Sequence, residues 1–245
     1  MTTDASPARL KRFLAARLDP KVYLGLHVTV SLLLCALAAW AFGAIVDAVL
    51  DNDTVVRWDI AAAAAIHARV TPFGLRVFEV ITNLGSPVVV SLVVVAMAIW
   101  CWRRQERVLA VGVVVICAGE AILDGVLKSV VHRTRPEFAV RFLHSQSFSF
   151  PSGHSFGSIV AYGLLAFLIV DFYRPIARTR RLVWIVAAGL IVLIGISRTY
   201  LGVHYPSDVV GGWSAGIAWL AICLTGLRFA RARSGHGASQ SPISA

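Results

Sequence analysis

Charged residues are scarce in this sequence. Asp, Glu, Lys and Arg make up 15% of its 245 residues and hydrophobic residues 58%, whereas a typical soluble domain has about 25% charged residues. So little charge cannot cover the surface of a soluble domain of this length. The mean hydropathy of +0.75 is instead typical of a chain that crosses a membrane several times.

Cysteine is scarce as well, and its placement excludes two kinds of site. The four cysteines all fall in or at the edge of apolar stretches: Cys35, Cys101, Cys117 and Cys223. No connecting loop contains a cysteine. We therefore expect neither a disulfide framework nor a thiolate metal site.

Long apolar runs dominate what is present. Six stretches are candidate spans: 22–46, 86–102, 108–127, 155–170, 182–203 and 209–227. The first holds 25 residues without a formal charge, which is enough to cross a hydrocarbon core of about 30 Å. It is also longer than the apolar part of a signal peptide, so we expect it to be retained. The sequence predicts an all-α integral membrane fold with six transmembrane helices.

The parts outside the spans are short. Residues 51–85 have the apolar spacing of one or two short helices at the membrane interface, with a break at Pro72–Gly74 and a turn at Asn83–Ser86. We predict a basic cytoplasmic tail over 1–21 and a six-span domain over 22–228, with its active site within 128–208. The Ser/Gly-rich end predicts a disordered, basic cytoplasmic tail over 229–245.

The net charge of +10 is sorted by side. Fifteen of the 23 Lys and Arg residues fall on one side of a six-span topology: Arg9, Lys11, Arg12, Arg17, Lys21, Arg103, Arg104, Arg107, Arg174, Arg178, Arg180, Arg181, Arg228, Arg231 and Arg233. Such clusters mark the cytoplasmic side, so both termini should be cytoplasmic. Topology and contact with anionic lipids explain these cations without nucleic-acid binding.

One outer loop breaks this pattern. Residues 128–150 should lie outside, yet they hold four cations: Lys128, Arg133, Arg135 and Arg141. Two other polar clusters, 151–154 and 198–208, reach the same face. Because helix N-termini bind anions and guanidinium groups bind phosphate in a bidentate manner, this face predicts a phosphate site.

The expected phosphate ligands combine charge and backbone. Lys128, Arg135 and Arg198 supply fixed positive charge. Gly153 lets an anion approach the backbone closely, and the Ser152 hydroxyl can add a donor.

The same face offers groups for covalent chemistry. His204 and Asp208 are four residues apart and share one face if this segment is near-helical. A carboxylate bonded to one ring nitrogen makes the other nitrogen a better nucleophile. His154, at the start of a helix, could protonate a leaving oxygen. The alternative, that both are interfacial histidines with capping partners, explains the surrounding cations poorly.

These residues form a known three-part pattern. "KSVVHRTRP" (128–136), "PSGH" (151–154) and "SRTYLGVHYPSD" (197–208) resemble the signature of the type 2 phosphatidic acid phosphatase superfamily, with every spacing matched. The resemblance implies that His204 forms a phosphohistidine, that Asp208 orients it, and that His154 is the acid and then the base for water. It also implies a phosphate site made by the five ligands above, and no metal or other cofactor.

The resemblance leaves some polar residues without a role. His132 and Arg133 lie at variable positions of the first motif. Glu120, Asp124 and Lys128 form one stripe of a helix, and we favour a structural role, with Asp124 steadying the Lys128 ammonium, over substrate selection. The remaining histidines are read as structural or solvated: His27, His67, His144 and His236.

The predicted function is a cell-membrane phosphatase that removes the terminal phosphate of a lipid at the outer face. Phosphatidic acid, phosphatidylglycerol phosphate and polyprenyl diphosphate all fit, and the sequence distinguishes neither among them nor among oligomeric states. Related vanadium haloperoxidases are soluble, so six spans count against that activity. The alternative is a lipid-phosphate transporter or binding protein, although such a protein would not need His204 with Asp208, and transporters place polar groups near the midplane.

Overall fold

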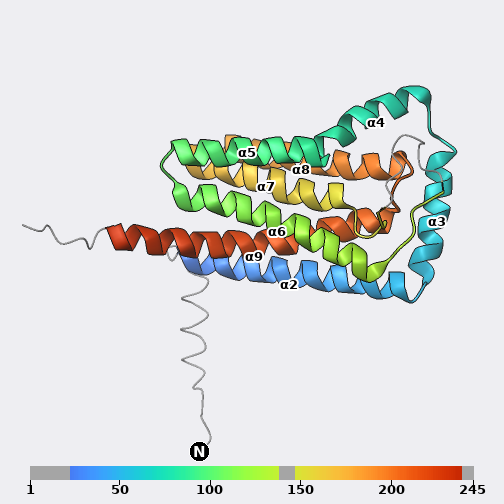
Figure 1. Ribbon diagram of the computed structural model, residues 1–245, viewed down its shortest axis with the longest axis horizontal. Helices are drawn as coiled ribbons and strands as arrows, with labels where there is room; N and C mark the ends of the chain where they lie inside the picture. The colour runs from blue at the N-terminus through green and yellow to red at the C-terminus, as the bar shows by residue number, and fades with distance from the viewer. Residues whose placement is uncertain (1–22, 138–146, 239–245) are drawn as a thin grey trace, which may run out of the picture.

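A computed structural model describes residues 23–137 and 147–238 (Figure 1). This part of the chain contains eight helices and no strand, which confirms the predicted all-α class. The helices are α2 (Tyr23–Leu50), α3 (Thr54–His67), α4 (Pro72–Leu84), α5 (Pro87–Arg103), α6 (Arg107–Val131), α7 (Gly153–Tyr173), α8 (Ala177–Tyr200) and α9 (Pro206–Ala238).

The six predicted spans are all present. Long, apolar helical stretches cover 28–50, 72–103, 107–131, 153–173, 177–200 and 206–231, and the second of them joins α4 to α5. Large apolar side chains such as Leu33, Leu92 and Ile185 are more than 60% exposed. In a membrane-spanning bundle such side chains face lipid rather than water.

Residues 51–85 fold as two helices, α3 and α4, as predicted, although α4 continues into the second apolar stretch. Thr71 caps α4 by accepting a hydrogen bond from Gly74 N at 3.0 Å. The break predicted at Pro72–Gly74 lies instead at 68–71, because the fixed φ of proline suits the first turn of a helix. The predicted turn at Asn83–Ser86 is confirmed, since α4 ends at Leu84 and Ser86 caps α5.

Helix α3 runs across one end of the bundle (Figure 1). Its outer face carries Trp58 and Ile60, which are 71% and 53% exposed, whereas Asp59 and Ala63 are buried. This amphipathic pattern agrees with a helix that lies on the bundle at the membrane interface. The buried carboxylate of Asp59 reaches α9, as described below.

Helix α7 is the central element. It packs against α5, α6, α8 and α9, and Phe156, Leu164 and Leu168 on it are completely buried. A helix that is apolar on all sides is stable only when it is surrounded by other helices or by lipid. Its first turn, with Gly153 and His154, is thereby fixed among four neighbouring helices.

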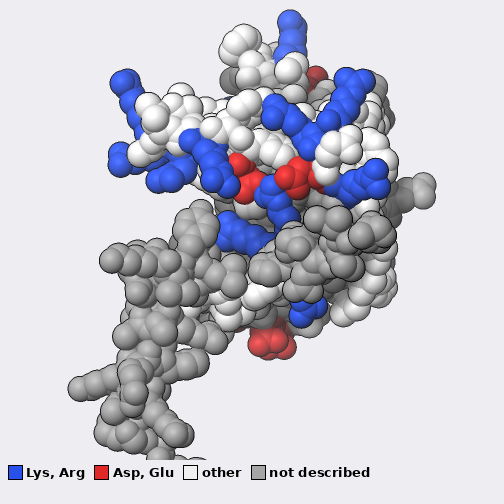
Figure 2. Space-filling model, turned by 90° about the vertical axis from the view of Figure 1, so that its left-hand side faces the viewer, with Lys and Arg blue, Asp and Glu red and all other residues white. Residues whose placement is uncertain are grey.

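The end of the bundle opposite α3 is basic (Figure 2). The connections α5–α6 and α7–α8 and the end of α9 lie there (Figure 1). On α9, Arg231 donates hydrogen bonds to Asp171 and Glu106. Residues 229–238 continue α9, and the predicted disorder of the tail 229–245 stays a prediction.

All four cysteines are free, as expected. The N-terminal tail (1–21), the last seven residues (239–245) and Arg141 with His144 lie outside the described residues.

Candidate active site

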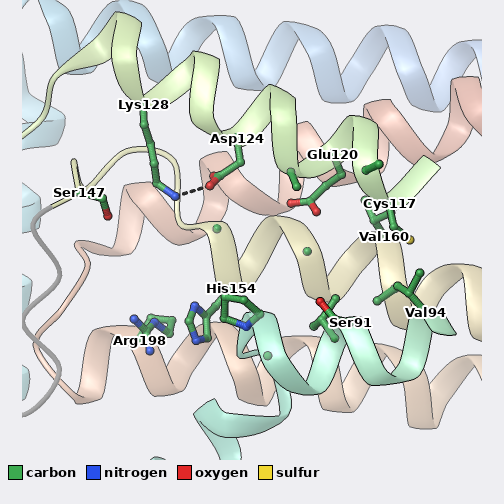
Figure 3. A pocket seen from close by; sticks show the side chains of 18 of the residues that line it. Ser91, Val94, Cys117, Glu120, Asp124, Lys128, Ser147, His154, Val160 and Arg198 are labelled. Atoms are coloured by element: carbon green, nitrogen blue, oxygen red, sulfur yellow. Dashed lines mark hydrogen bonds and ion pairs between the residues drawn. The ribbon is translucent and has the colours of Figure 1, made fainter. Parts of the chain in front are cut away.

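The three polar clusters of the sequence meet at the end of the bundle that carries α3. They border a cavity of about 560 Å³ that continues between α5, α6 and α7 (Figure 3). Six of the eight predicted site residues line it: Lys128, Arg135, Gly153, His154, Arg198 and His204. The other two, Ser152 and Asp208, are completely buried and lie outside the cavity wall.

His204 is a buried ring held from both sides. Its Nδ1 lies 3.4 Å from Asp208 Oδ2, and its Nε2 lies 3.2 Å from Arg135 Nη1. Burial lowers the pKa of His204 to about 4, although the hydrogen bond to Asp208 acts in the opposite direction. The neutral ring therefore carries its proton on Nδ1, facing the carboxylate, and its Nε2 accepts a hydrogen bond from Arg135 at the wall of the cavity.

Asp208 accepts hydrogen bonds on both carboxylate oxygens. Arg133 Nη1 donates to Oδ1 at 2.6 Å, and the Tyr205 backbone N–H donates to Oδ2 at 2.8 Å. The Ser149 hydroxyl also donates to Oδ2. A carboxylate held by three donors at the first turn of α9 has a fixed orientation toward the His204 ring.

Arg133 extends this network to α3. Its Nη2 lies 2.7 Å from Asp59 Oδ2, and its guanidinium lies 4.4 Å from the centroid of the Tyr205 ring. Burial would lower the pKa of Arg133, but the carboxylates of Asp208 and Asp59 outweigh burial and raise it. Asp59 in turn accepts from Ser207 N at 3.0 Å and from the Ser207 hydroxyl at the start of α9.

The sequence analysis assigned no role in the site to three members of this network: Asp59, Arg133 and Ser149. A signal existed for Arg133, which is a cation on the side where cations are rare. Asp59 is a lone carboxylate ahead of the run Ala61–Ala65, and its register toward α9 depends on how α3 lies on the bundle. Ser149 lies in a segment without a regular pattern, and we see no sequence signal for it.

Arg198 is the most buried of the three predicted phosphate-binding cations. It is 5% exposed, and its Nη1 donates to Thr82 Oγ1 on α4 at 2.7 Å. Its Nε has no hydrogen-bond partner among the described residues. A buried, unpaired guanidinium nitrogen beside a cavity is energetically unfavourable unless an anion completes it.

Lys128 and Gly153 lie against one another. The Lys128 ammonium pairs with the Asp124 carboxylate one turn earlier on α6 (Figure 3), which is the contact predicted for Asp124. A Cβ at position 153 would lie 2.9 Å from both Lys128 Nζ and Asp124 Oδ2. A larger residue would displace the ends of these two side chains, so glycine permits the close approach of the α7 N-terminus to the ammonium.

Arg135 fixes the loop after α6 to the site. Its Nε donates to Ser147 O, and its Nη1 donates to Val203 O, both at 2.9 Å. Burial lowers the pKa of Arg135, and the Asp208 carboxylate partly offsets this. The guanidinium thus lies beside His204 with its plane set by two backbone carbonyls.

His154 lies beside Arg198 in the cavity (Figure 3). It shares this region with Gly85, at the turn between α4 and α5, where a Cβ would lie 3.3 Å from His154 Cδ2. The absent side chain at position 85 leaves room for the imidazole. The "NLGS" turn thereby helps to shape the site.

Two other residues lie apart from the cavity. The Ser152 hydroxyl accepts a hydrogen bond from Ser155, so its predicted contact with phosphate stays a prediction. The His132 ring packs edge-on against Phe148 with centroids 4.4 Å apart. No cluster of three or more His, Cys, Asp or Glu suited to a metal occurs within 23–137 and 147–238, and metal independence also stays a prediction.

Comparison with known proteins points to the same motifs. The family model described as the PAP2 superfamily matches residues 107–231. Phosphatidylglycerophosphatase B of Bacillus subtilis (strain 168) is 33% identical over 178 residues, which cover 72% of this chain and 86% of that protein. Lipid A 1-phosphatase of Rhizobium johnstonii is 34% identical over 119 residues, or 45% of this chain and 43% of the other.

The fold comparison agrees. The crystal structure of a transmembrane PAP2-type phosphatidylglycerolphosphate phosphatase from Bacillus subtilis superimposes with a TM-score of 0.71 and 28% sequence identity, over 86% of this chain and 98% of the other. The matched family region contains all eight predicted site residues, and the relatives in both comparisons are phosphatases. This chain is a multi-pass membrane protein that belongs to the PAP2 superfamily.

Proposed function

We propose that this protein is a membrane phosphatase that hydrolyses the terminal phosphate of a lipid through a covalent phosphohistidine at His204. The observation that carries the proposal is the ring of His204, whose Nδ1 faces Asp208 and whose Nε2 faces a cavity with Arg135 beside it. The phosphatase class rests also on the family and on relatives named as lipid phosphatases.

In the first step, the Nε2 lone pair of His204 attacks phosphorus in line with the leaving oxygen. The bond from phosphorus to that oxygen breaks, and His154 donates the proton that the departing alcohol needs. As the ring becomes cationic, Asp208 stabilises the proton on Nδ1.

In the second step, water attacks the phosphohistidine. The neutral His154 takes a proton from this water, the bond between phosphorus and Nε2 breaks, and its electron pair returns to His204. Inorganic phosphate leaves, and the enzyme is back in its starting state, with His154 protonated and His204 neutral.

Positive groups stabilise the charge on the three equatorial oxygens of both transition states. Lys128, Arg135 and Arg198 border the cavity, and so do Gly153 and His154 at the start of α7, so the positive end of the helix dipole lies at the cavity. The unpaired Nε of Arg198 is the donor most clearly in need of an anion.

The other end of the cavity suits a lipid tail. Its wall between α5, α6 and α7 is mainly apolar: Val90, Val94, Val95, Val114, Ala118 and Val160. A phosphate at the cationic end and a hydrocarbon chain along the valines would both be accommodated. A water-soluble phosphate ester would leave the apolar wall uncovered.

The site is proposed to face outward. The described arginines at the far end of the bundle belong to the fifteen cations that mark the cytoplasmic side (Figure 2). A reporter fused after Arg228 should therefore read as cytoplasmic. An external signal from that reporter would overturn the orientation.

The central test is phosphate release from lipid phosphates in detergent with EDTA present. His204→Ala should abolish phosphate release while keeping lipid-phosphate binding. His132→Ala, which changes a histidine outside the cavity, should retain phosphate release. Incubation with substrate labelled in its terminal phosphate should label the wild type and leave His204→Ala unlabelled. Wild-type release by the His204→Ala variant would refute the nucleophile; movement of lipid between leaflets without any release by the wild type would support a transporter.

A further inference from the structure

Glu120 is a buried carboxyl group in the wall of the cavity. It projects from α6 into the cavity (Figure 3) and is 8% exposed. It makes no hydrogen bond or ion pair with any described residue; the one cation nearby, Lys128, is paired with Asp124. Its oxygens open onto the cavity rather than onto protein atoms, and an ionisable side chain within a membrane span is a candidate for binding a ligand.

The position of Glu120 identifies which part of a substrate it meets. It precedes Asp124 by four residues, or about 6 Å along α6. On the neighbouring helix α7, a Cβ at Gly153 would contact Asp124 and Lys128, whereas a Cβ at Gly157 would lie 3.6 Å from Glu120 Oε1. Glu120 thus lies one turn deeper than the phosphate site.

Deeper still, the cavity becomes apolar, with Val94, Val114 and Val160 in its wall. A lipid with its phosphate among the cations and its chain along these valines must pass Glu120 with the atoms just beyond the scissile ester. These atoms belong to the leaving alcohol.

We propose that Glu120 binds a free hydroxyl group on the leaving alcohol, on the carbon next to the ester carbon, and so selects lipid phosphates with a hydroxylated linker such as glycerol. A hydroxyl both donates and accepts, so a carboxyl group pairs with it in either protonation state. An esterified glycerol carbon or a prenyl chain has no such donor. The second phosphate of a diphosphate would meet this carboxyl group instead of a cation. This inference rests on the proposed phosphatase activity.

The test compares two lipids that differ by one oxygen. They are 1-acylglycerol 3-phosphate, whose hydroxyl lies on the carbon next to the ester carbon, and its 2-deoxy analogue with the same chain. For the wild type, kcat/KM should be roughly three- to tenfold higher for the hydroxylated lipid, the range expected for one hydrogen bond. Glu120→Leu and Glu120→Ala should lower kcat/KM only for the hydroxylated lipid, so that the ratio falls to one.

Two further variants complete the test. Glu120→Gln should keep part of the preference because an amide also donates and accepts. Glu106→Gln changes a glutamate at the other end of α6, where it pairs with Arg231, and should keep the full preference.

The outcomes separate this inference from the proposed function. A wild type that cleaves both lipids equally, a Glu120→Leu variant that keeps the preference, or an equal loss for both lipids would each overturn hydroxyl selection by Glu120 and leave the phosphatase intact. Release of phosphate from neither lipid, nor from any other lipid phosphate, would overturn the proposed function itself.

Discussion

Replacing Arg133 by leucine should damage both the stability and the activity of this protein. Arg133 lies between two carboxylates: its Nη1 is 2.6 Å from Asp208 Oδ1, and its Nη2 is 2.7 Å from Asp59 Oδ2. The Asp208 side chain is 0% exposed, that of Asp59 4% and that of Arg133 8%. Leucine removes the charge and leaves both carboxylates buried without it.

The expected size of the effect follows from this burial. Breaking a buried ion pair by removing one partner destabilises a protein by about 3–5 kcal/mol. Activity should fall as well, because an Asp208 that takes up a proton no longer holds Nδ1–H of His204 or stabilises the cationic ring. Phosphate release and the half-life of activity on heating in detergent measure the two effects.

Variants at Asp59 separate the effects of the two carboxylates. Asp59→Asn should be milder, since it leaves the Arg133–Asp208 pair intact and its amide oxygen can still accept from Ser207. The double variant Asp59→Asn/Arg133→Leu should be less damaged than the sum of the single changes, because only one carboxylate is then left unpaired. Arg57→Leu is the matched control. Arg57 lies exposed on α3, the helix that carries Asp59, and among the described residues it donates only to Thr54.

The reasoning would be refuted if Arg133→Leu inactivated on heating at the same rate as Arg57→Leu and kept its kcat. It would also be refuted if the two changes at Asp59 and Arg133 were simply additive. Either result would mean that the contacts of Arg133 hold neither α3 nor Asp208 in place.

Three further predictions concern the chemistry of the site. Because burial lowers the pKa of His204 to about 4, the ring is neutral above that pH. On the acid side of the pH profile, kcat/KM, corrected for ionisation of the substrate phosphate, should therefore fall only as the pH drops toward 4. An acid-side fall centred near the ordinary histidine value of about 6.5 would contradict this. Gly153→Ala places a methyl group 2.9 Å from the Lys128 ammonium and should lower kcat/KM by roughly ten- to 100-fold, whereas Gly125→Ala, with open space around its Cβ, should not; equal kinetics for the two variants would argue against close approach at Gly153. His154→Ala should slow release about 10²- to 10⁴-fold for an alkyl phosphate and much less for an aryl phosphate, whose leaving group needs little protonation; an equal loss for both substrates would remove the role as acid.

Most of the fold was predictable because a membrane imposes simple rules. A run such as 22–46 must form a helix, since lipid cannot satisfy free backbone groups, and its length alone decides that it spans. The ends were less certain. The helix α9 extends to Ala238, beyond the predicted end of the span at Leu227, and the partners of Arg231 on it, Asp171 and Glu106, come from other elements.

The site residues likewise divide into those that the sequence predicts and those that it does not. Its motif residues, such as Lys128 and His204, carry reactive groups at fixed spacings, so the sequence by itself determined the chemistry and the order of the parts. The Asp124–Lys128 pair was also predictable, because residues four apart on a helix are neighbours.

Only the tertiary structure decided which groups support that chemistry. Asp59 accepts hydrogen bonds from Arg133, 74 residues further along the chain, and from Ser207, 148 residues further along. Thr82 accepts one from Arg198, 116 residues further along. Glu120 could be assigned to the cavity only once α6 and α7 were placed together. The physical reason is that such contacts depend on how helices rotate and cross when they pack, which is set by the summed fit of many side chains and leaves no spacing in the sequence.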